Sequence, residues 1–151
     1  SFLAYYFGIL LDDVMLVQAT SEAEIFQQMI HINEQDVVIG ISFPRYSRKA
    51  VKAMQFAHDC GAKGIAITDT AVSPLAEYAD YALLARSDIA AIVDSLVAPL
   101  SLIDALIVTL ALKKENIMDE TFQRLEDIWD EYHVYEKVEN AAEDDSKDAN
   151  A

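Results

Sequence analysis

The sequence predicts an α/β fold in which a parallel sheet forms the middle of three layers and helices cover both of its faces. Three short runs are apolar almost throughout and contain β-branched residues, which is typical of parallel strands covered on both faces: Asp36–Ser42, Lys63–Asp69 and Tyr81–Ala85. Helical segments alternate with these runs at the spacing of βαβ units. The two observations together favour a doubly wound arrangement.

Three elements are expected before the first of these strands. Phe2–Leu11 is apolar on nearly all sides and predicts a buried helix, and Asp13–Gln18 predicts a short strand. Ser21–Ile30 begins with a capping serine and has Glu24 three residues later, which is the capping-box pattern of a helix start. Since a doubly wound domain normally starts with a strand, we expect the displayed chain to begin inside a larger protein.

The segments between and after the strands are expected to be helical. Tyr46–Cys60 gathers its apolar residues on one face, and Gly61 ends it. Ser73–Ala79 starts with a capping serine followed by proline, which is the favoured start of a helix. Ile89–Lys113 predicts a long and very apolar helix, and Met118–Tyr135 carries an amphipathic stripe.

Length and charge indicate one acidic domain with a short tail. The 151 residues suit a single domain, which we place at 1–136, and 53% of them are hydrophobic, enough for a sizeable core. Residues 137–151 are acidic, contain few large apolar side chains and predict a disordered tail. The net charge of −15 repels phosphodiester backbones, so we expect no direct binding of DNA or RNA by this chain.

Cysteine content and hydropathy predict a cytoplasmic protein. Cys60 is the single cysteine, so no disulfide can form within the chain, which fits a reducing compartment. The most apolar long run, Ile89–Leu112, is interrupted by Asp94, Pro99 and Asp104. It therefore predicts a buried or interface helix rather than a membrane span.

The richest polar segment follows the first predicted strand, at the strand end where open parallel sheets bind their ligands. Ser42 and Ser47 flank Arg45 just before a predicted helix, whose N–H groups and dipole suit a phosphate. Four of the eleven Lys and Arg residues fall within eight positions: Arg45, Arg48, Lys49 and Lys52. Cations at a helix start oppose the dipole, and a bound anion would remove that conflict. The segment predicts a phosphate site or, as the simpler alternative, a serine-capped helix with a solvated basic face.

Other polar residues offer weaker candidates. Thr68–Thr70 either lines the same pocket with hydroxyls or forms a polar turn, and Ser73 is most simply a helix cap. The three histidines show no metal-ligand spacing, and no glycine-rich phosphate loop, dinucleotide fingerprint or nucleophile elbow occurs. Glutamates such as Glu22 and Glu24 form no pair that the pattern ties to a pocket. We expect no metal, no cofactor and no catalytic residue.

The run from Asp36 to Ala85 resembles the core of the sugar isomerase (SIS) domain family. It reads DVVIGISFPRYSRKAVKAMQFAHDCGAKGIAITDTAVSPLAEYADYALLA, with the family's order of an Asp-led strand ending in Ser, a helix and a Thr-Asp turn. Phe43–Val51 more narrowly resembles the SIS domain of RpiR-type bacterial transcription regulators. The resemblance implies a SIS-type, flavodoxin-like fold that binds a phosphosugar and helps to dimerise. DNA would be bound by an N-terminal helix-turn-helix domain, which this sequence lacks.

The resemblance also implies roles for particular residues. SIS enzymes usually read S-x-S-G-x-T after this strand, and those hydroxyls hold the phosphate; Ser42 matches the first Ser and Ser47 matches the Thr. Pro44 replaces the second Ser and Arg45 replaces the Gly, a departure typical of the regulator branch that makes Arg45 a substitute phosphate ligand. Ser1 matches the hydroxyl of the loop after the family's first strand. The candidate ligand-binding residues are Ser42, Arg45, Ser47, Ser1, Pro44 and Tyr46.

Residues and resemblance together predict the phosphosugar-sensing effector and dimerisation domain of a bacterial regulator of carbohydrate metabolism, and not an enzyme. The expected partners are a sugar phosphate, a second copy of the chain in a homodimer or higher homo-oligomer, and DNA only through the helix-turn-helix domain; no membrane partner is expected. One alternative is an aldose–ketose sugar-phosphate isomerase, which needs a Glu or His base within hydrogen-bond reach. Another is a scaffold that only dimerises.

Overall fold

The computed structural model describes residues 1–87, 89–90 and 93–135 of the chain. It divides into two compact units, Ser1–Lys113 and Lys114–Ala151. The first unit contains the sheet and all the candidate ligand-binding residues. The tail predicted at 137–151 lies outside the described residues.

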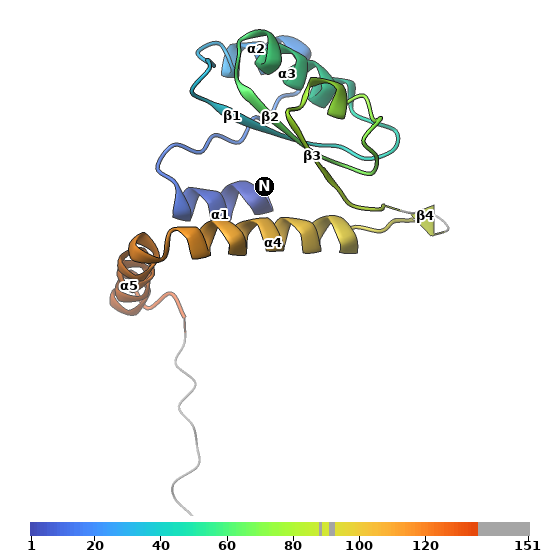
Figure 1. Ribbon diagram of the computed structural model, residues 1–151. Coiled ribbons are helices and arrows are strands. Elements are labelled where there is room, and N and C mark those ends of the chain that lie inside the picture. The colour runs from blue at the N-terminus through green and yellow to red at the C-terminus, as the bar shows by residue number, and fades with distance from the viewer. Residues whose placement is uncertain (88, 91–92, 136–151) are drawn as a thin grey trace, which may run out of the picture. The chain divides into compact units, whose positions relative to one another are not determined.

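The first unit is built on a parallel three-stranded sheet in the order β1-β2-β3. Helices cover both faces, with α2 and α3 on one side and α1 and α4 on the other (Figure 1). This arrangement confirms the predicted three-layer α/β fold. The elements are α1 (Phe2–Leu10), α2 (Glu22–Gln28), β1 (Val37–Ile41), α3 (Arg48–Asp59), β2 (Lys63–Thr68), the 3-10 turn η1 (Ala76–Tyr78), β3 (Tyr81–Leu84), the short antiparallel pair β4 (Ile89–Ala90) and β5 (Val93–Asp94), and α4 (Val97–Lys113).

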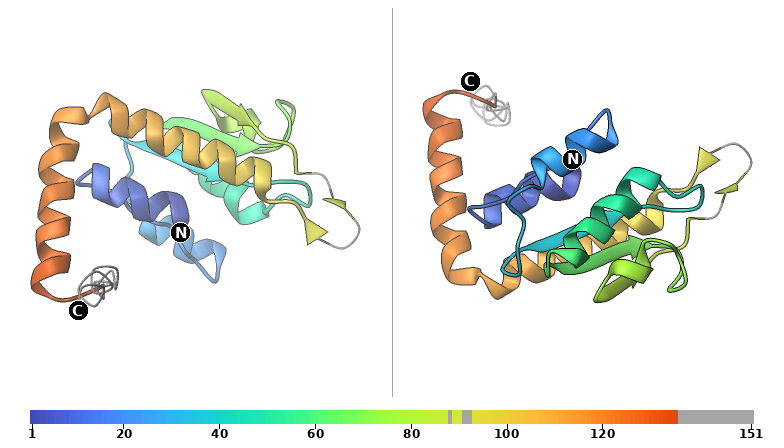
Figure 2. Two further views of the ribbon diagram at one scale, coloured as in Figure 1. Left: turned by 90° about the horizontal axis from the view of Figure 1, so that it is seen from below. Right: turned by 90° about the horizontal axis from the view of Figure 1, so that it is seen from above.

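Alternation along the strands divides the core between the two faces of the sheet. On β2, Ala66 packs with Met54 of α3 and with Leu75, whereas its neighbour Ile67 packs with Leu3 of α1 and Ile103 of α4. The two helices on the second face lie side by side (Figure 2). A third cluster joins α2 to α3 through the buried side chains of Ile25, Met29, Ala57 and Ala62. The central strand is thus buried from both sides, as its nearly continuous apolar run predicted.

Two glycines in the strands allow the layer above the sheet to approach closely. A Cβ atom on Gly64 would lie 2.9 Å from the carbonyl oxygen of Tyr78 and 3.0 Å from Cε of Met54. A Cβ atom on Gly40 would lie 2.7 Å from Sδ of the same methionine. Gly64 therefore requires glycine for packing, because the opposing atom belongs to the backbone, whereas a larger residue at Gly40 would have to displace the buried side chain of Met54.

The strand predicted at Asp13–Gln18 is wrong, because this segment has no regular secondary structure and belongs to neither sheet. One of its apolar side chains reaches the core, because Val17 packs against the α2–α3 cluster, whereas Met15 and Leu16 are exposed. Its backbone, however, is bound by a side chain: the N–H of Gln18 donates to Oε1 of Gln28 (3.1 Å), and Nε2 of Gln28 donates to the Gln18 carbonyl (2.6 Å). An amide side chain here takes the place of a neighbouring strand.

Three predicted helices differ from the observed ones. The helix predicted at Phe2–Leu11 forms, but only one side of it is buried, and Tyr5 is 63% exposed. The segment Ser73–Ala79 contains only the single turn η1. Within Ile89–Lys113 the helix begins at Val97, after the β4–β5 pair. Pro99 then falls in the first helical turn, where a proline costs no intrahelical hydrogen bond.

The second unit contains α5 (Glu115–Glu131), which confirms the predicted amphipathic helix near the C-terminus. Apolar side chains on this helix are partly exposed, including Phe122 and Ile128. The ring of Trp129 packs edge-on against that of Tyr135, 5.5 Å between centroids. Among the described residues, no helix combines the length and the hydropathy that a membrane span needs.

Candidate ligand site

The turn between β1 and α3 is held closed by a buried serine. The N–H of Ser42 donates to the carbonyl of Ile67 on β2 (3.1 Å), so this residue continues the register of the sheet. Its hydroxyl oxygen accepts a hydrogen bond from the N–H of Ser47 (2.9 Å). The two serines that the sequence singled out therefore form the two ends of one pinned turn, which we call the Ser42–Ser47 turn.

The start of α3 leaves two backbone donors without an acceptor among the described residues. Ser47 is the N-cap, and its hydroxyl accepts from the N–H of Ala50 (3.4 Å), while the N–H of Val51 donates to the Ser47 carbonyl (3.1 Å). The N–H groups of Arg48 and Lys49 donate to no other residue in the described part of the chain. A helix start with free N–H groups carries a partial positive charge and is suited to an anion.

Arg45 has a left-handed backbone, with φ at 68°. For a residue with a Cβ atom this conformation costs about 1–2 kcal/mol, and glycine adopts it freely. The geometry gives a physical reason for the Gly of the enzyme pattern at this position. Arg45 and the preceding Pro44 are exposed, and the proline removes one N–H from the turn.

Two lysines of the basic cluster, Lys49 and Lys52, have partners within the protein and do not depend on an anion. The ammonium group of Lys49 donates to the carbonyls of Ala19 (3.3 Å) and Thr20 (2.6 Å), ahead of α2. Lys52 forms an ion pair with Glu22 (2.6 Å), and this hydrogen bond lowers the pKa of the Glu22 carboxyl. These two lysines fasten α3 to the start of α2.

A second polar group links the Ser42–Ser47 turn to the loop after β2. The hydroxyl of Tyr46 donates to Oδ1 of Asp69 (2.7 Å), and the hydroxyl of the fully buried Thr68 donates to the same oxygen (3.3 Å). The hydrogen bond to this carboxylate raises the pKa of Tyr46. We call these three residues the Tyr46–Asp69 group.

Sequence reasoning proposed Tyr46 as a ligand residue but did not connect it with Asp69. The available signal was their position, since each follows one of two neighbouring parallel strands, whose carboxyl ends share one edge of the sheet. The rest of the Thr68–Thr70 segment behaves as a turn, because the hydroxyl of Thr70 accepts from the N–H of Val72 (3.4 Å). Ser73 is a cap, with its buried hydroxyl accepting from the N–H of Ala76 (3.2 Å).

Ser1 lies apart from the other candidates. It precedes α1, its side chain makes no capping hydrogen bond, and within the described part of the chain none joins it to the Ser42–Ser47 turn. The N-terminus does lie at the end of α1 that is nearer to the carboxyl ends of the strands (Figures 1 and 2). The structure thus places Ser1 toward the end of the sheet where the strands finish, outside the Ser42–Ser47 turn.

The carboxylates considered as an acid–base pair have structural partners. Glu22 pairs with Lys52, and Oε2 of Glu24 accepts from both the N–H (2.7 Å) and the hydroxyl (2.9 Å) of Thr20. These hydrogen bonds, the one from the N–H first, lower the pKa of Glu24. Across residues 1–87, 89–90 and 93–135, no three side chains of metal-binding type gather into one cluster.

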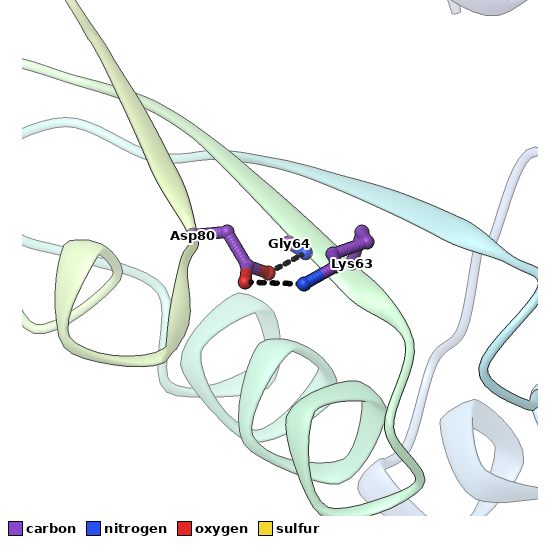
Figure 3. Close-up of polar contacts among 3 residues, drawn as sticks. All are labelled: Lys63, Gly64 and Asp80. Atoms are coloured by element: carbon purple, nitrogen blue, oxygen red, sulfur yellow. Dashed lines mark hydrogen bonds and ion pairs between the residues drawn. The ribbon is translucent and has the colours of Figure 1, made fainter.

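A further carboxylate, Asp80, lies at the opposite edge of the sheet, where the strands begin (Figure 3). Its Oδ2 accepts from the N–H of Gly64 (2.8 Å), and its Oδ1 accepts from the ammonium group of Lys63 (3.1 Å). The Gly64 hydrogen bond, reinforced by Lys63, lowers the pKa of Asp80. Asp80 ties the start of β3 to β2 and has no part in the candidate site.

Curated proteins similar to this chain are bacterial regulators. An uncharacterized HTH-type transcriptional regulator from Caldanaerobacter subterraneus is 35% identical over 91 residues, which are 58% of this chain and 32% of that protein. Another from Haemophilus influenzae is 28% identical over 103 residues, 66% of this chain and 36% of that protein. The chain therefore spans about a third of the length of these relatives.

Solved structures with the same fold include the sugar isomerase domain of an RpiR transcription factor from Sphaerobacter thermophilus. It has a TM-score of 0.75 and 25% identity, with 83% of this chain and 69% of that chain covered. The NanR protein of Vibrio vulnificus, solved with ManNAc-6P, has a TM-score of 0.69 and 15% identity over 87% of this chain and 50% of that chain. The family model of the SIS domain matches residues 1–109. That match covers well over half of the 151 residues, and the chain belongs to the SIS domain family.

Proposed function

We propose that this chain is the phosphosugar-sensing effector domain of a bacterial transcription regulator of carbohydrate metabolism, and that it is not an enzyme. The observation that supports this best is the Ser42–Ser47 turn, where two unused N–H groups and two serine hydroxyls surround the start of α3. The related proteins agree, since both curated relatives are named as HTH-type regulators and the NanR neighbour was solved with a phosphosugar.

The phosphate would bind at the start of α3. Its oxygens would accept hydrogen bonds from the N–H groups of Arg48 and Lys49, which have no acceptor among the described residues. The oxygen atoms of Ser42 and Ser47 are already used as acceptors, which leaves both hydroxyl protons to donate to the ligand. Arg45 would add a charged and bidentate contact from the turn, where Pro44 and Tyr46 shape the backbone, and Ser1 would approach from the end of α1.

We propose no catalytic residue. An aldose–ketose isomerase needs a base that moves a proton between adjacent carbons of the sugar. Glu22 and Glu24, the carboxylates that the sequence offered as an acid–base pair, are bound to other groups. No observation favours the isomerase alternative over the regulator.

The exposed apolar side chains of α1 and α4 would pair two copies of the chain in a homodimer. These helices lie side by side, and their exposed residues include Phe2, Tyr5, Leu100, Val108 and Leu112. Bound phosphosugar would then bias the spacing of two DNA-binding domains of the kind that HTH-type relatives carry, as a shift between dimer states. A regulator of this kind acts in the cytoplasm. We further propose that the domain extends to residue 136 and that 137–151 form an acidic disordered tail.

Isothermal titration calorimetry with a panel of hexose and amino-sugar phosphates tests the proposal. We expect at least one phosphosugar to bind, and we expect Ser47→Ala to lower the affinity for that ligand at least about tenfold. Ser21→Ala is the matched control, because Ser21 caps α2 as Ser47 caps α3. Both variants should lose about 1 kcal/mol of stability, but Ser21→Ala should bind like the wild type.

A lack of binding by every member of the panel would refute the sensing function. Equal affinities for the Ser47 and Ser21 variants would instead show that the serine at the start of α3 is only a cap. Coupled assays with the same sugars should detect no turnover. Sedimentation velocity with and without the best ligand reports whether the chain forms the proposed dimer.

A further inference from the structure

The loops that follow β1 and β2 leave the sheet next to each other. Ile41 pairs with Ile67 in the register of the two strands, so Ser42 and Thr68, the next residues on each, come side by side. Neighbouring strands are about 4.8 Å apart. A ligand whose phosphate binds to the Ser42–Ser47 turn therefore has the loop that begins at Asp69 within the length of its sugar.

Asp69 has hydrogen-bonding capacity that the described part of its chain does not use. Oδ1 accepts from both Tyr46 and Thr68, whereas Oδ2 accepts from no residue that the structure describes. Asp69 is partly exposed. An ionised carboxylate accepts about four hydrogen bonds and donates none, so its remaining sites suit a ligand that carries O–H or N–H groups.

We propose that Asp69, oriented by Tyr46, determines specificity by accepting hydrogen bonds from the hydroxyl or amide N–H groups of the bound sugar. The proposal rests on the phosphosugar function argued above and assigns the sugar end of the same ligand. A carboxylate repels a phosphate, so Asp69 contributes nothing favourable to inorganic phosphate or to a phosphate ester without donors. It favours ligands whose sugar offers donors beyond the phosphate.

Tyr46 acts as a positioning residue in this arrangement. Its phenol donates to one carboxylate oxygen at 2.7 Å and so fixes the plane of the carboxylate. Because Tyr46 belongs to the Ser42–Ser47 turn, the same turn that would hold the phosphate also sets the orientation of the group that would recognise the sugar. Loss of the phenol hydroxyl should therefore weaken sugar recognition while leaving the phosphate contacts in place.

The test compares ligands with and without sugar hydroxyls, using calorimetry on the whole chain. The probes are the tightest-binding hexose phosphate of the panel, methyl phosphate and inorganic phosphate. We expect Asp69→Asn to lower the affinity for the hexose phosphate about tenfold to a hundredfold, which is the effect of losing a hydrogen bond to a charged group. Its affinity for methyl phosphate and inorganic phosphate should be unchanged or higher. Tyr46→Phe should lower the affinity for the hexose phosphate by a smaller factor and leave the affinities for the other two probes unchanged.

Asp59→Asn is the matched control, since it removes the same charge from an exposed position at the far end of α3. It should bind all three probes like the wild type. Equal weakening of all three probes by Asp69→Asn, or no change in hexose phosphate affinity, would overturn the specificity role while the sensing function stands. Failure of the wild type to bind any phosphosugar would overturn both. Should Asp69→Asn not fold, the Tyr46→Phe variant decides by the same comparison of probes.

Discussion

Asp80 lies where the strands of the parallel sheet begin, which we call the amino edge, and Asp69 lies where they end, the carboxyl edge. The hydrogen-bond partners of these two carboxylates differ in kind. Asp80 uses both oxygens on its own chain, one for the N–H of Gly64 and one for the ammonium group of Lys63. Asp69 uses one oxygen only among the described residues, and its two donors are side-chain hydroxyls. The partners of Asp80 include the backbone itself, whereas those of Asp69 are side chains only.

The difference separates a structural carboxylate from one that is suited to a ligand. A backbone N–H in a strand cannot turn away, so its hydrogen bond to Asp80 permanently joins β2 and β3. A hydroxyl rotates and can both donate and accept, so the Tyr46–Asp69 group can adjust to a bound molecule. Changes at the amino edge should therefore alter the stability of the fold, and changes at the carboxyl edge should alter binding.

The largest effect on stability is expected from Gly64→Ala at the amino edge. The added methyl group would lie 2.9 Å from a backbone carbonyl, that of Tyr78, which cannot move without shifting η1. Overpacking of this kind costs about 1–3 kcal/mol, and we expect the upper half of that range. Chemical denaturation followed by circular dichroism measures the loss.

Gly8→Ala is the matched control for this substitution. Gly8 lies in α1, and a Cβ atom added to it would meet no atom of the described residues within 4 Å. Alanine should stabilise the helix there by up to about 1 kcal/mol. The same chemical change thus has opposite signs at the two positions, and a destabilised Gly8→Ala would contradict the packing argument.

A smaller effect, with opposite signs for stability and binding, is expected from Arg45→Gly at the carboxyl edge. Glycine removes the strain of the left-handed backbone but makes the unfolded chain more flexible, so we expect a gain of roughly 0.5–1 kcal/mol relative to Arg45→Ala, which lacks the same side chain. Loss of the guanidinium should weaken phosphosugar binding about tenfold. Thermal unfolding and calorimetry on one preparation measure both quantities.

Two further variants separate strain from charge at this turn. Arg45→Ala removes the charge and keeps the strained backbone, so it should bind as weakly as the glycine variant without its gain in stability. His133→Gly relieves a left-handed residue in the second unit, where φ is 50°, and should leave binding unchanged. A fall in stability for Arg45→Gly would show that the arginine side chain supports the turn more than its backbone strains it.

The same division between edges explains how far the sequence alone could predict this protein. The strands were predictable because a buried parallel strand needs an unbroken apolar run, and the Ser42–Ser47 turn because it must follow such a strand. The partners of Lys49 and Lys52 were not predictable, because they lie at the start of α2, about thirty residues earlier. The Tyr46–Asp69 hydrogen bond is likewise a contact between two loops, and no local pattern encodes it.

The irregular Asp13–Gln18 segment shows the same limit in the fold. Its four apolar residues are consecutive, as in a buried strand, but Val17 reaches the core whereas Met15 and Leu16 are exposed. Whether such a segment joins a sheet depends on which groups lie opposite its backbone, and here both polar backbone groups of Gln18 are bound by the side chain of Gln28. A short apolar run alone therefore does not predict the hydrogen-bond partners of its backbone.

The smallest effect is expected from Asp80→Asn, because this carboxylate is exposed enough for solvent to screen it. Its hydrogen bonds from Gly64 and Lys63 hold its folded-state pKa below the unfolded value of about 4. A lowered folded pKa adds stability above the unfolded pKa, and that stability is lost as the pH falls through the folded pKa. The difference in stability between wild type and Asp80→Asn should be constant near neutral pH and shrink below about pH 4. Denaturation at several pH values measures it, and phosphosugar affinity at pH 7 should match the wild type. A variant that loses affinity but not stability would place Asp80 with the ligand site and erase the distinction between the two edges.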